Sequence, residues 1–128
     1  MIPIDRDVDI VTARQAGREL AMKVGFKGSD LTLIATAISE VARNIVVYAQ
    51  RGEIGLRLAA SGGRQGIEVI ATDEGPGIAD IEQAMQDGFS TGRSLGLGLP
   101  GARRLMDEFE IASTVGKGTT VTMRKWRP

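Results

Sequence analysis

The 128-residue sequence contains no cysteine and no histidine. Without cysteine there are no disulfides and no thiolate nucleophiles, and without either residue type a zinc site of the usual kind is excluded. Imidazole acid–base chemistry and phosphohistidine are excluded for the same reason. Any chemistry must therefore use carboxylates, amides, hydroxyls, lysine, arginine and backbone groups.

A surplus of one charge sign is also absent, since 16 Lys and Arg balance 16 Asp and Glu. A general nucleic-acid or membrane-surface binder needs a basic surplus, so the balance argues against both classes. No stretch approaches the ~20 apolar residues of a membrane span. Residues 1–7 lack the basic and apolar regions of a signal peptide. We therefore expect a cytoplasmic protein.

The length and a composition of 42% hydrophobic and 25% charged residues are those of one globular domain over residues 1–128. Apolar residues that recur every three or four positions predict its helices. We expect Asp9 to cap the first helix and Ser29 or Asp30 to cap the second, because short polar side chains accept hydrogen bonds from free N–H groups. The predicted helices cover about residues 9–24, 31–49, 81–86 and 97–106.

Alternation of apolar and polar residues predicts two hairpins, the first with a longer loop over residues 61–66. Pro3 cannot donate to a ladder, so its short segment suits a sheet edge. Runs of strands beside runs of helices predict an α+β fold with a mixed, mostly antiparallel sheet and helices packed on one face. The predicted strands cover about residues 2–4, 53–60, 67–72, 109–115 and 119–126.

Residues 111–128 contain basic residues and no acidic residue. This asymmetry favours a solubilised edge strand. A patch that faces a partner is the alternative interpretation. The basic residues are Lys117, Arg124, Lys125 and Arg127.

Glu40 and Asn44 lie four residues apart on the second predicted helix. This spacing places the two side chains on the same face of the helix, one turn apart, beside the apolar stripe. A carboxylate and an amide there suit Mg²⁺, which takes a few protein oxygens and keeps waters, and the carboxylate can act as a general base. Spacing alone favours an ordinary solvated helix flank, because such pairs are common.

The segment Asp73-Glu74-Gly75-Pro76-Gly77 ends an apolar strand. Two glycines on either side of a proline give a tight turn that another molecule can approach closely. A carboxylate at the end of a half-buried strand is costly unless it is paired, and it can accept a hydrogen bond from an exocyclic amine. Taken alone, a strand-ending turn is the simpler interpretation.

Residues 96–101 (GLGLPG) match G-x-G-x-x-G. Glycine-rich backbone before a helix offers free N–H groups and a positive dipole end to phosphate. The chain lacks the preceding strand and later acid of a Rossmann site and has no P-loop, and it lacks the His-Arg-Asp and Asp-Phe-Gly signatures of eukaryotic protein kinases. A flexible loop before a helix remains open, and residues 116–120 (GKGTT) by themselves indicate a hairpin turn.

The order of these four motifs resembles the GHKL ATP-binding (Bergerat) fold shared by gyrase B, Hsp90, MutL and histidine-kinase ATPase domains. The sequence has E-x-x-x-N on a helix, D-x-G-x-G after a strand, G-x-G-L before a helix and G-x-G-T between the last strands. Within that fold, residues 40–49 (EVARNIVVYA) and 88–101 (GFSTGRSLGLGLPG) are similar to the RsbT-type switch protein-serine kinases nearly residue for residue. The resemblance covers essentially the whole chain.

The resemblance implies roles for single residues toward ATP and Mg²⁺. Asn44 would hold Mg²⁺ against the triphosphate, and Glu40 would be the general base that takes a proton from the attacking hydroxyl. Asp73 would bond the adenine amino group, with Gly77 and Thr119 near the base.

The same resemblance implies that Gly75 and Gly77 let the backbone close over the nucleotide. It places Arg93 in the ATP lid with Ser90 and Thr91, as a candidate for charge stabilisation on the γ-phosphate. The short stretch between Gly77 and the glycine loop implies a small lid. The residues that would cradle phosphates are Gly96, Leu97 and Gly98.

The implied activity is ATP-dependent phosphorylation of serine or threonine on STAS-domain stressosome proteins (RsbS- and RsbR-like). Once released from them, the kinase would activate a PP2C-type phosphatase (RsbU-like) in a partner-switching stress response. The chain lacks a phosphoacceptor histidine, so it is not a histidine kinase. Two alternatives remain open: an anti-sigma factor kinase of the SpoIIAB or RsbW type that sequesters a sigma factor, and a nucleotide-gated module that only binds a partner.

Overall fold

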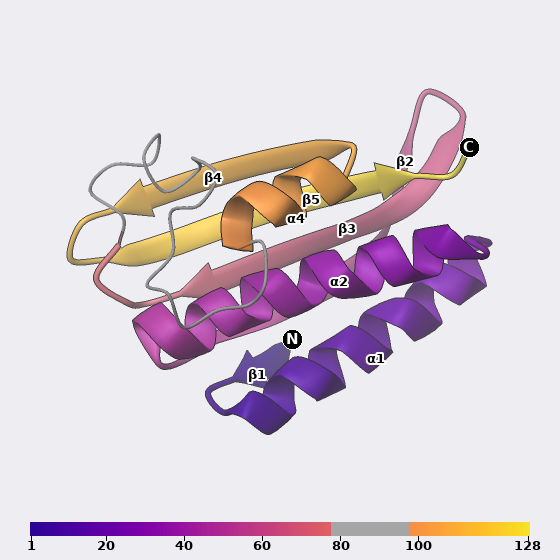
Figure 1. The fold of residues 1–128 in the computed structure, drawn as a ribbon. Coiled ribbons are helices and arrows are strands. Elements are labelled where there is room, and N and C mark those ends of the chain that lie inside the picture. The colour runs from indigo at the N-terminus through magenta and orange to yellow at the C-terminus, as the bar shows by residue number, and fades with distance from the viewer. Residues whose placement is uncertain (78–97) are drawn as a thin grey trace.

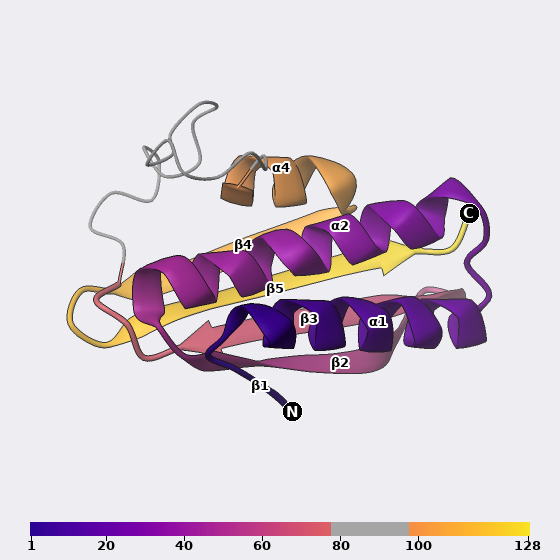
Figure 2. The same cartoon turned by 60° about the horizontal axis from the view of Figure 1, so that its bottom comes forward.

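A computed structural model describes residues 1–77 and 98–128 and shows helices on one face of a five-stranded sheet (Figures 1 and 2). The strand order is β1-β2-β3-β5-β4, and every pairing among the described strands is antiparallel. The α+β prediction is confirmed, and the described sheet is antiparallel rather than mixed. The elements are β1 Ile2–Ile4, α1 Asp7–Val24, α2 Ser29–Asn44, η1 Ile45–Ala49, β2 Gly52–Ser61, β3 Arg64–Asp73, α4 Gly98–Leu105, β4 Glu108–Thr114 and β5 Gly118–Trp126.

The core lies between α2 and the inner face of the sheet. Helix α2 buries Ile34 and Ile38 completely, and β3 does the same with Ile67 and Val69. Each such side chain contributes about 1.5–3 kcal/mol when it leaves water. Gly17 of α1 brings the two long helices close together, because a Cβ at this position would overlap the side chain of Ile38.

The first helix begins two residues earlier than the sequence predicts. Asp9 is not the capping residue. It lies in the first turn, where its Oδ2 accepts hydrogen bonds from the backbone N–H groups of Asp5 and Arg6 at 3.0 Å each. These two bonds favour the carboxylate form and lower the pKa of Asp9.

The second helix also differs from its prediction at both ends. Gly28 holds the N-cap position, so Ser29 and Asp30 lie inside the first turn and do not cap it. Regular α-helix ends at Asn44, and residues 45–49 form one π-helical turn instead of a further α-turn. Such wide turns are rare and are often found at functional sites.

The first hairpin is tighter than the sequence indicates. Ser61 pairs with Arg64, so only Gly62 and Gly63 form the turn between β2 and β3. Both glycines have positive φ, at 57° and 80°, which matches the two-residue turns whose twist fits a hairpin. The predicted longer loop over residues 61–66 is therefore wrong.

The basic C-terminal strand is not an edge strand. Strand β5 lies between β3 and β4, whereas the predicted edge strand β1 does lie at the edge. Arg124 of β5 contacts Glu68 and Glu108, and the Lys125 ammonium donates to the carbonyl oxygen of Leu105 at 3.0 Å. These basic side chains are thus engaged within the fold.

Contrary to the sequence expectation, residues 29–49 form a helical stretch that is, by length and composition, apolar enough to cross a membrane, with a mean hydropathy of 1.3. Half of this stretch is buried inside the protein. Its buried side chains form the stripe that packs on the sheet. Core packing therefore accounts for the apolar character of this segment.

Candidate functional site

A polar row ends the otherwise apolar inner face of the sheet. Thr119 of β5 pairs with Asp73 of β3 on one side and with Ser113 of β4 on the other. The three residues share the face of Ile67, Val69 and Val121, because side chains two apart on a strand point the same way. This row lies at the end of the molecule where α2 ends (Figure 1).

The Asp73 carboxylate is 9% exposed and is anchored through one oxygen. Its Oδ1 accepts hydrogen bonds from the N–H of Gly75 at 2.9 Å and from the N–H of Thr119 at 3.3 Å. No hydrogen bond to Oδ2 is present within the described residues. The second oxygen is therefore able to accept a hydrogen bond from a ligand.

Glycines around Asp73 fit tightly against neighbouring backbone. A Cβ on Gly75 would lie 2.6 Å from the Cβ of Ala49, and a Cβ on Gly118 would overlap the carbonyl oxygen of Asp73. Gly77 has a φ of 78°, and the neighbouring Pro76 carbonyl accepts a hydrogen bond from Gly116 at 2.9 Å. The turn after β3 is thus fixed against both the end of the helix and the β4–β5 hairpin.

Glu40 joins α2 to the start of α4. The Glu40 side chain is buried, and its Oε2 accepts a hydrogen bond from the N–H of Gly98 at 2.9 Å. That N–H belongs to the first turn of α4, where backbone donors have no partner inside the helix. The other oxygen, Oε1, lies 3.5 Å from Nη1 of Arg43. The structure thus brings Glu40 and Gly98 together, although they are 58 residues apart.

Asn44 is half-buried at the last α-helical position before the π-turn. The π-turn ends at Gln50, whose φ of 71° is positive, and it sets Ala49 against Gly75. Among residues 1–77 and 98–128, no group of three acidic side chains is positioned to hold a metal ion. An oxygen donor set of Glu40 and Asn44 fits Mg²⁺, which takes one or two protein ligands together with phosphate oxygens and waters.

Several predictions fall on residues outside the described part of the chain. They are the short helix over residues 81–86, the lid residues Ser90, Thr91 and Arg93, and the phosphate-contacting Gly96 and Leu97. The other predicted residues fall into two groups. One group gathers Asp73, Gly75 and Thr119, with Gly77 at its rim. The other joins Glu40 to Gly98, and Asn44 lies four residues further along the same helix.

Sequence reasoning missed two residues at the first group. Gly118 was part of a motif but had no role, and its positive φ of 127° beside the Asp73 carbonyl explains why glycine is needed there. Ser113 had no role either. Its Oγ donates to the Gly118 carbonyl at 3.1 Å and lies 2.8 Å from Oγ1 of Thr119. Its position in the predicted strand, opposite Thr119, was the only signal that could have found it.

Comparison with known proteins gives this arrangement a family. Residues 3–125 match the histidine kinase-like ATPase domain family. The chain is 53% identical over 118 residues to the serine/threonine-protein kinase RsbT of Bacillus subtilis (strain 168), which covers 92% of this chain and 89% of that protein. It is 42% identical over 99 residues to the anti-sigma F factor of Thermoanaerobacter sp. (strain X514), covering 73% of this chain and 68% of that protein.

Solved structures show the same fold. The mycobacterial sensor histidine kinase MprB superimposes with a TM-score of 0.60, covering 98% of this chain and 97% of that chain. Sequence identity to it is 21%, so this likeness concerns the fold alone.

Proposed function

The chain belongs to the histidine kinase-like ATPase family and is a serine/threonine-protein kinase, and on that premise we propose that it phosphorylates STAS-domain partner proteins from ATP and Mg²⁺. Residues 1–128 are proposed to act as one catalytic domain in the cytoplasm. One observation carries the assignment of the site. A buried carboxylate on α2, Glu40, accepts from the first N–H of α4, and the π-turn that continues α2 packs Ala49 against Gly75, whose N–H is bonded to a second buried carboxylate, Asp73.

The spacing along the helix suits a nucleotide. Ala49 lies nine positions after Glu40; the α-helical part to Asn44 spans about 6 Å at ~1.5 Å per residue, and the π-turn over residues 45–49 adds to this length. Ala49 lies against Gly75, whose N–H is bonded to Asp73. We assign the adenine base to the Asp73 end, with Gly75, Gly77 and Thr119 around it. We assign the phosphates to the stretch between Asn44 and Gly98.

Phosphoryl transfer depends mostly on positioning and on charge neutralisation. The acceptor hydroxyl attacks the γ-phosphorus, a new O–P bond forms, and the bond to the β,γ-bridging oxygen breaks as ADP leaves. Glu40 receives the proton of the attacking hydroxyl. The amide of Asn44 would hold Mg²⁺ against the triphosphate, and the ion would supply positive charge opposite the phosphate oxygens. Gly96, Leu97 and Arg93 are proposed, from the motif alone, to contact the phosphates.

The family relatives support a signalling role through exchange of partners. We propose that STAS-domain proteins of the stressosome (RsbS- and RsbR-like) are the substrates. Their phosphorylation releases the kinase, which then activates a PP2C-type phosphatase (RsbU-like) in a stress response. The 53% identity to RsbT over most of both chains supports this choice.

The 42% identity to an anti-sigma F factor supports a second candidate, in which the kinase sequesters a sigma factor. The test is incubation of the protein with γ-labelled ATP, Mg²⁺ and a purified STAS-domain protein, in parallel with a pull-down of sigma factor. We expect label on serine or threonine of the STAS protein and no retained sigma factor. Retention of sigma factor without transfer to stressosome-type STAS proteins would favour the second candidate. Binding of ATP with no transfer to any protein would contradict the kinase proposal.

A further inference from the structure

The Glu40 carboxylate has one partner on each of its two oxygens. Its Oε2 accepts a hydrogen bond from the N–H of Gly98 at 2.9 Å, and its Oε1 accepts one from Nη1 of Arg43 at 3.5 Å. The described residues give Glu40 no other hydrogen bond or ion pair. Because the side chain is buried, these two contacts replace most of the water that an exposed carboxylate would have.

The two partners differ in how nucleotide binding affects them. Gly98 begins α4, which packs against α2 (Figures 1 and 2), and its N–H lies in the stretch assigned to the phosphates. A phosphate oxygen that accepts from this N–H takes the bond away from Glu40. Arg43 lies on the same helix as Glu40, and their contact does not involve α4. Arg43 is therefore the partner that stays with the carboxylate when a nucleotide binds.

The Arg43 side chain is suited to hold this carboxylate. It lies three residues after Glu40 within the regular part of α2, where side chains at this spacing are neighbours. A guanidinium group is always charged, and its bonds to a carboxylate are strong and directional. Glu40 is the hydrogen-bond and ion-pair partner of Arg43 among residues 1–77 and 98–128. No second acidic side chain in this part of the chain competes for the guanidinium.

We propose that Arg43 is a positioning residue, which keeps the Glu40 carboxylate turned toward the acceptor hydroxyl during phosphoryl transfer. The inference rests on the proposed role of Glu40 as general base. A base has to stay within about 3 Å of the group whose proton it takes, and a carboxylate that has lost its Gly98 bond is free to rotate unless Arg43 holds it. Loss of Arg43 should therefore slow transfer through Glu40 alone. Nucleotide binding, assigned to Asp73, Asn44 and Gly98, should be retained.

The experiment measures transfer of γ-labelled phosphate to a purified STAS-domain protein and, separately, the affinity for ATP. Glutamine has nearly the helix propensity of arginine, so Arg43→Gln removes the charge and leaves α2 intact. It should lower kcat about tenfold and change the ATP dissociation constant less than about threefold. Arg43→Lys should retain about half of the wild-type kcat, because the contact with Glu40 uses a single nitrogen. Arg18→Gln, which changes an exposed arginine inside α1, is the matched control.

A double variant separates action through Glu40 from an independent role. If Arg43 acts through Glu40, its loss has no further effect once the base has been removed. Glu40→Gln combined with Arg43→Gln should then transfer phosphate at the rate of Glu40→Gln alone. A merely structural role of Arg43, or a contact of its own with phosphate, would give about the same tenfold loss in both backgrounds.

The outcomes distinguish this inference from the proposed function. Unchanged kcat in Arg43→Gln, an equal loss in both backgrounds, or a loss of ATP affinity as large as the loss of kcat overturns the role of Arg43 and leaves the proposed function intact. Failure of the wild-type protein to label the STAS-domain protein overturns the proposed function instead. If circular dichroism shows that Arg43→Gln is unfolded, Arg43→Met replaces it with the same expected values, because methionine keeps the helix propensity and an apolar stem.

Discussion

Two buried carboxylates on β3 show opposite ways of burying a negative charge. Glu68 and Asp73 are five residues apart, so they lie on opposite faces of the strand. Glu68, on the face without helices in the described chain, is 3% exposed and contacts the guanidinium groups of Arg57 and Arg124. Asp73, on the helix-covered face, is held by backbone N–H groups through a single oxygen. Both oxygens of Glu68 are thus paired with arginine side chains. Asp73 keeps one oxygen, Oδ2, that can accept a hydrogen bond from a ligand.

The Glu68 side belongs to a charged row across four strands. Arg57, Glu68, Arg124 and Glu108 are cross-strand neighbours in sequence from β2 to β4. Burial opposes ionisation of Glu68, but the hydrogen bonds from both arginines outweigh it and lower the pKa of this carboxyl. The pKa of Glu108 is lowered first by the indole N–H of Trp126 and then by Arg124.

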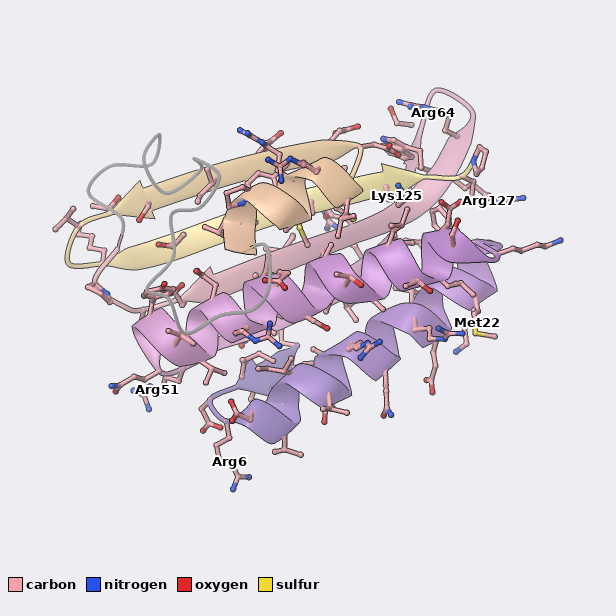
Figure 3. All side chains as sticks on the ribbon, viewed as in Figure 1. Arg6, Met22, Arg51, Arg64, Lys125 and Arg127 are labelled. Carbon is pink, nitrogen blue, oxygen red and sulfur yellow. The ribbon has the colours of Figure 1, made fainter. Side chains whose placement is uncertain are left out.

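The two ends of the molecule also differ in whether their charged side chains are paired. Figure 3 shows Arg64 at the tip of the β2–β3 hairpin and Arg51 at the opposite end, near the end of α2. The Arg64 guanidinium lies 4.6 Å from the centre of the Trp126 ring, a cation–π contact. A groove of about 460 Å³ at this end is lined by Arg57, Glu68, Arg124 and Trp126. Its charges neutralise one another, so it offers less to a charged ligand than the Asp73 end does.

The largest effect is expected at Glu40. Glu40→Gln keeps an oxygen that can accept from the Gly98 N–H but cannot act as a general base. We expect phosphoryl transfer to fall about 10²–10⁴-fold while ATP binding is largely retained, as measured by transfer of label and by titration. Glu19→Gln, an exposed glutamate on α1, is the control. Unchanged transfer would remove Glu40 from the chemistry.

A matched pair of glycines tests how closely the ligand end is packed. Gly116 and Gly118 both have positive φ, but only Gly118 has backbone within reach of a Cβ. Gly118→Ala should cost about 3 kcal/mol of unfolding free energy through strain and overlap with Asp73. Gly116→Ala should cost about 1 kcal/mol through strain alone. Urea denaturation measures both, and equal costs would contradict the packing argument.

Asp73→Asn tests whether the free oxygen binds the nucleotide. The amide retains one oxygen for the Gly75 and Thr119 N–H groups but replaces the other by a donor. We expect ATP affinity to fall about 100-fold, by equilibrium titration, with little change in thermal stability. Equal ATP affinity in the variant and the wild type would show that the base binds elsewhere.

The smallest effect is expected at Glu68, the carboxylate that is paired with two arginines. Glu68→Gln should lower the unfolding free energy by about 1–3 kcal/mol at pH 7, without a change in ATP affinity. Because the folded-state pKa of Glu68 is below 4.5, its ionised form stabilises the fold above that pH, and the stabilisation is lost as the pH falls through the folded pKa.

The difference between Glu68→Gln and the wild type should therefore shrink as the pH falls below 4.5 in urea denaturation. The control is Glu110→Gln, whose side chain is 73% exposed and lies 3.7 Å from Arg124. A difference that stays constant with pH, or one matched by the control, would contradict a role for the Glu68 charge.

Local sequence patterns predicted most helices and strands. They failed at helix ends and strand positions that depend on contacts with other parts of the chain. The helix periods and strand alternation predicted the two long helices and both hairpins, although with the wrong loop for the first, and Pro3 predicted the edge position of β1. The bounds of α1 and the cap of α2 were wrong, because Gly28 and the Asp9 bonds to Asp5 and Arg6 compete with ordinary cap preferences. The basic strand was assigned to an edge because its acidic partners, Glu68 and Glu108, come from other strands.

The candidate site likewise contains residues that the sequence predicted and contacts that only the structure showed. Residue type and spacing made Glu40, Asn44 and Asp73 candidates, and the family resemblance predicted their roles. It gave no role to Ser113, since a serine in a strand has no distinctive pattern until the register places it opposite Thr119. The contact between Glu40 and Gly98 joins residues 58 apart, and no spacing within one element predicts it.

By itself, the sequence determined which chemistry is available and which segments are helix or strand, because residue type and short-range periodicity act within a few residues. Tertiary structure alone decided that Glu68 of β3 is paired with arginine side chains, whereas Asp73 of the same strand keeps an oxygen for a ligand. That outcome depends on strand order and register, and these arise from packing between segments that are far apart in the chain.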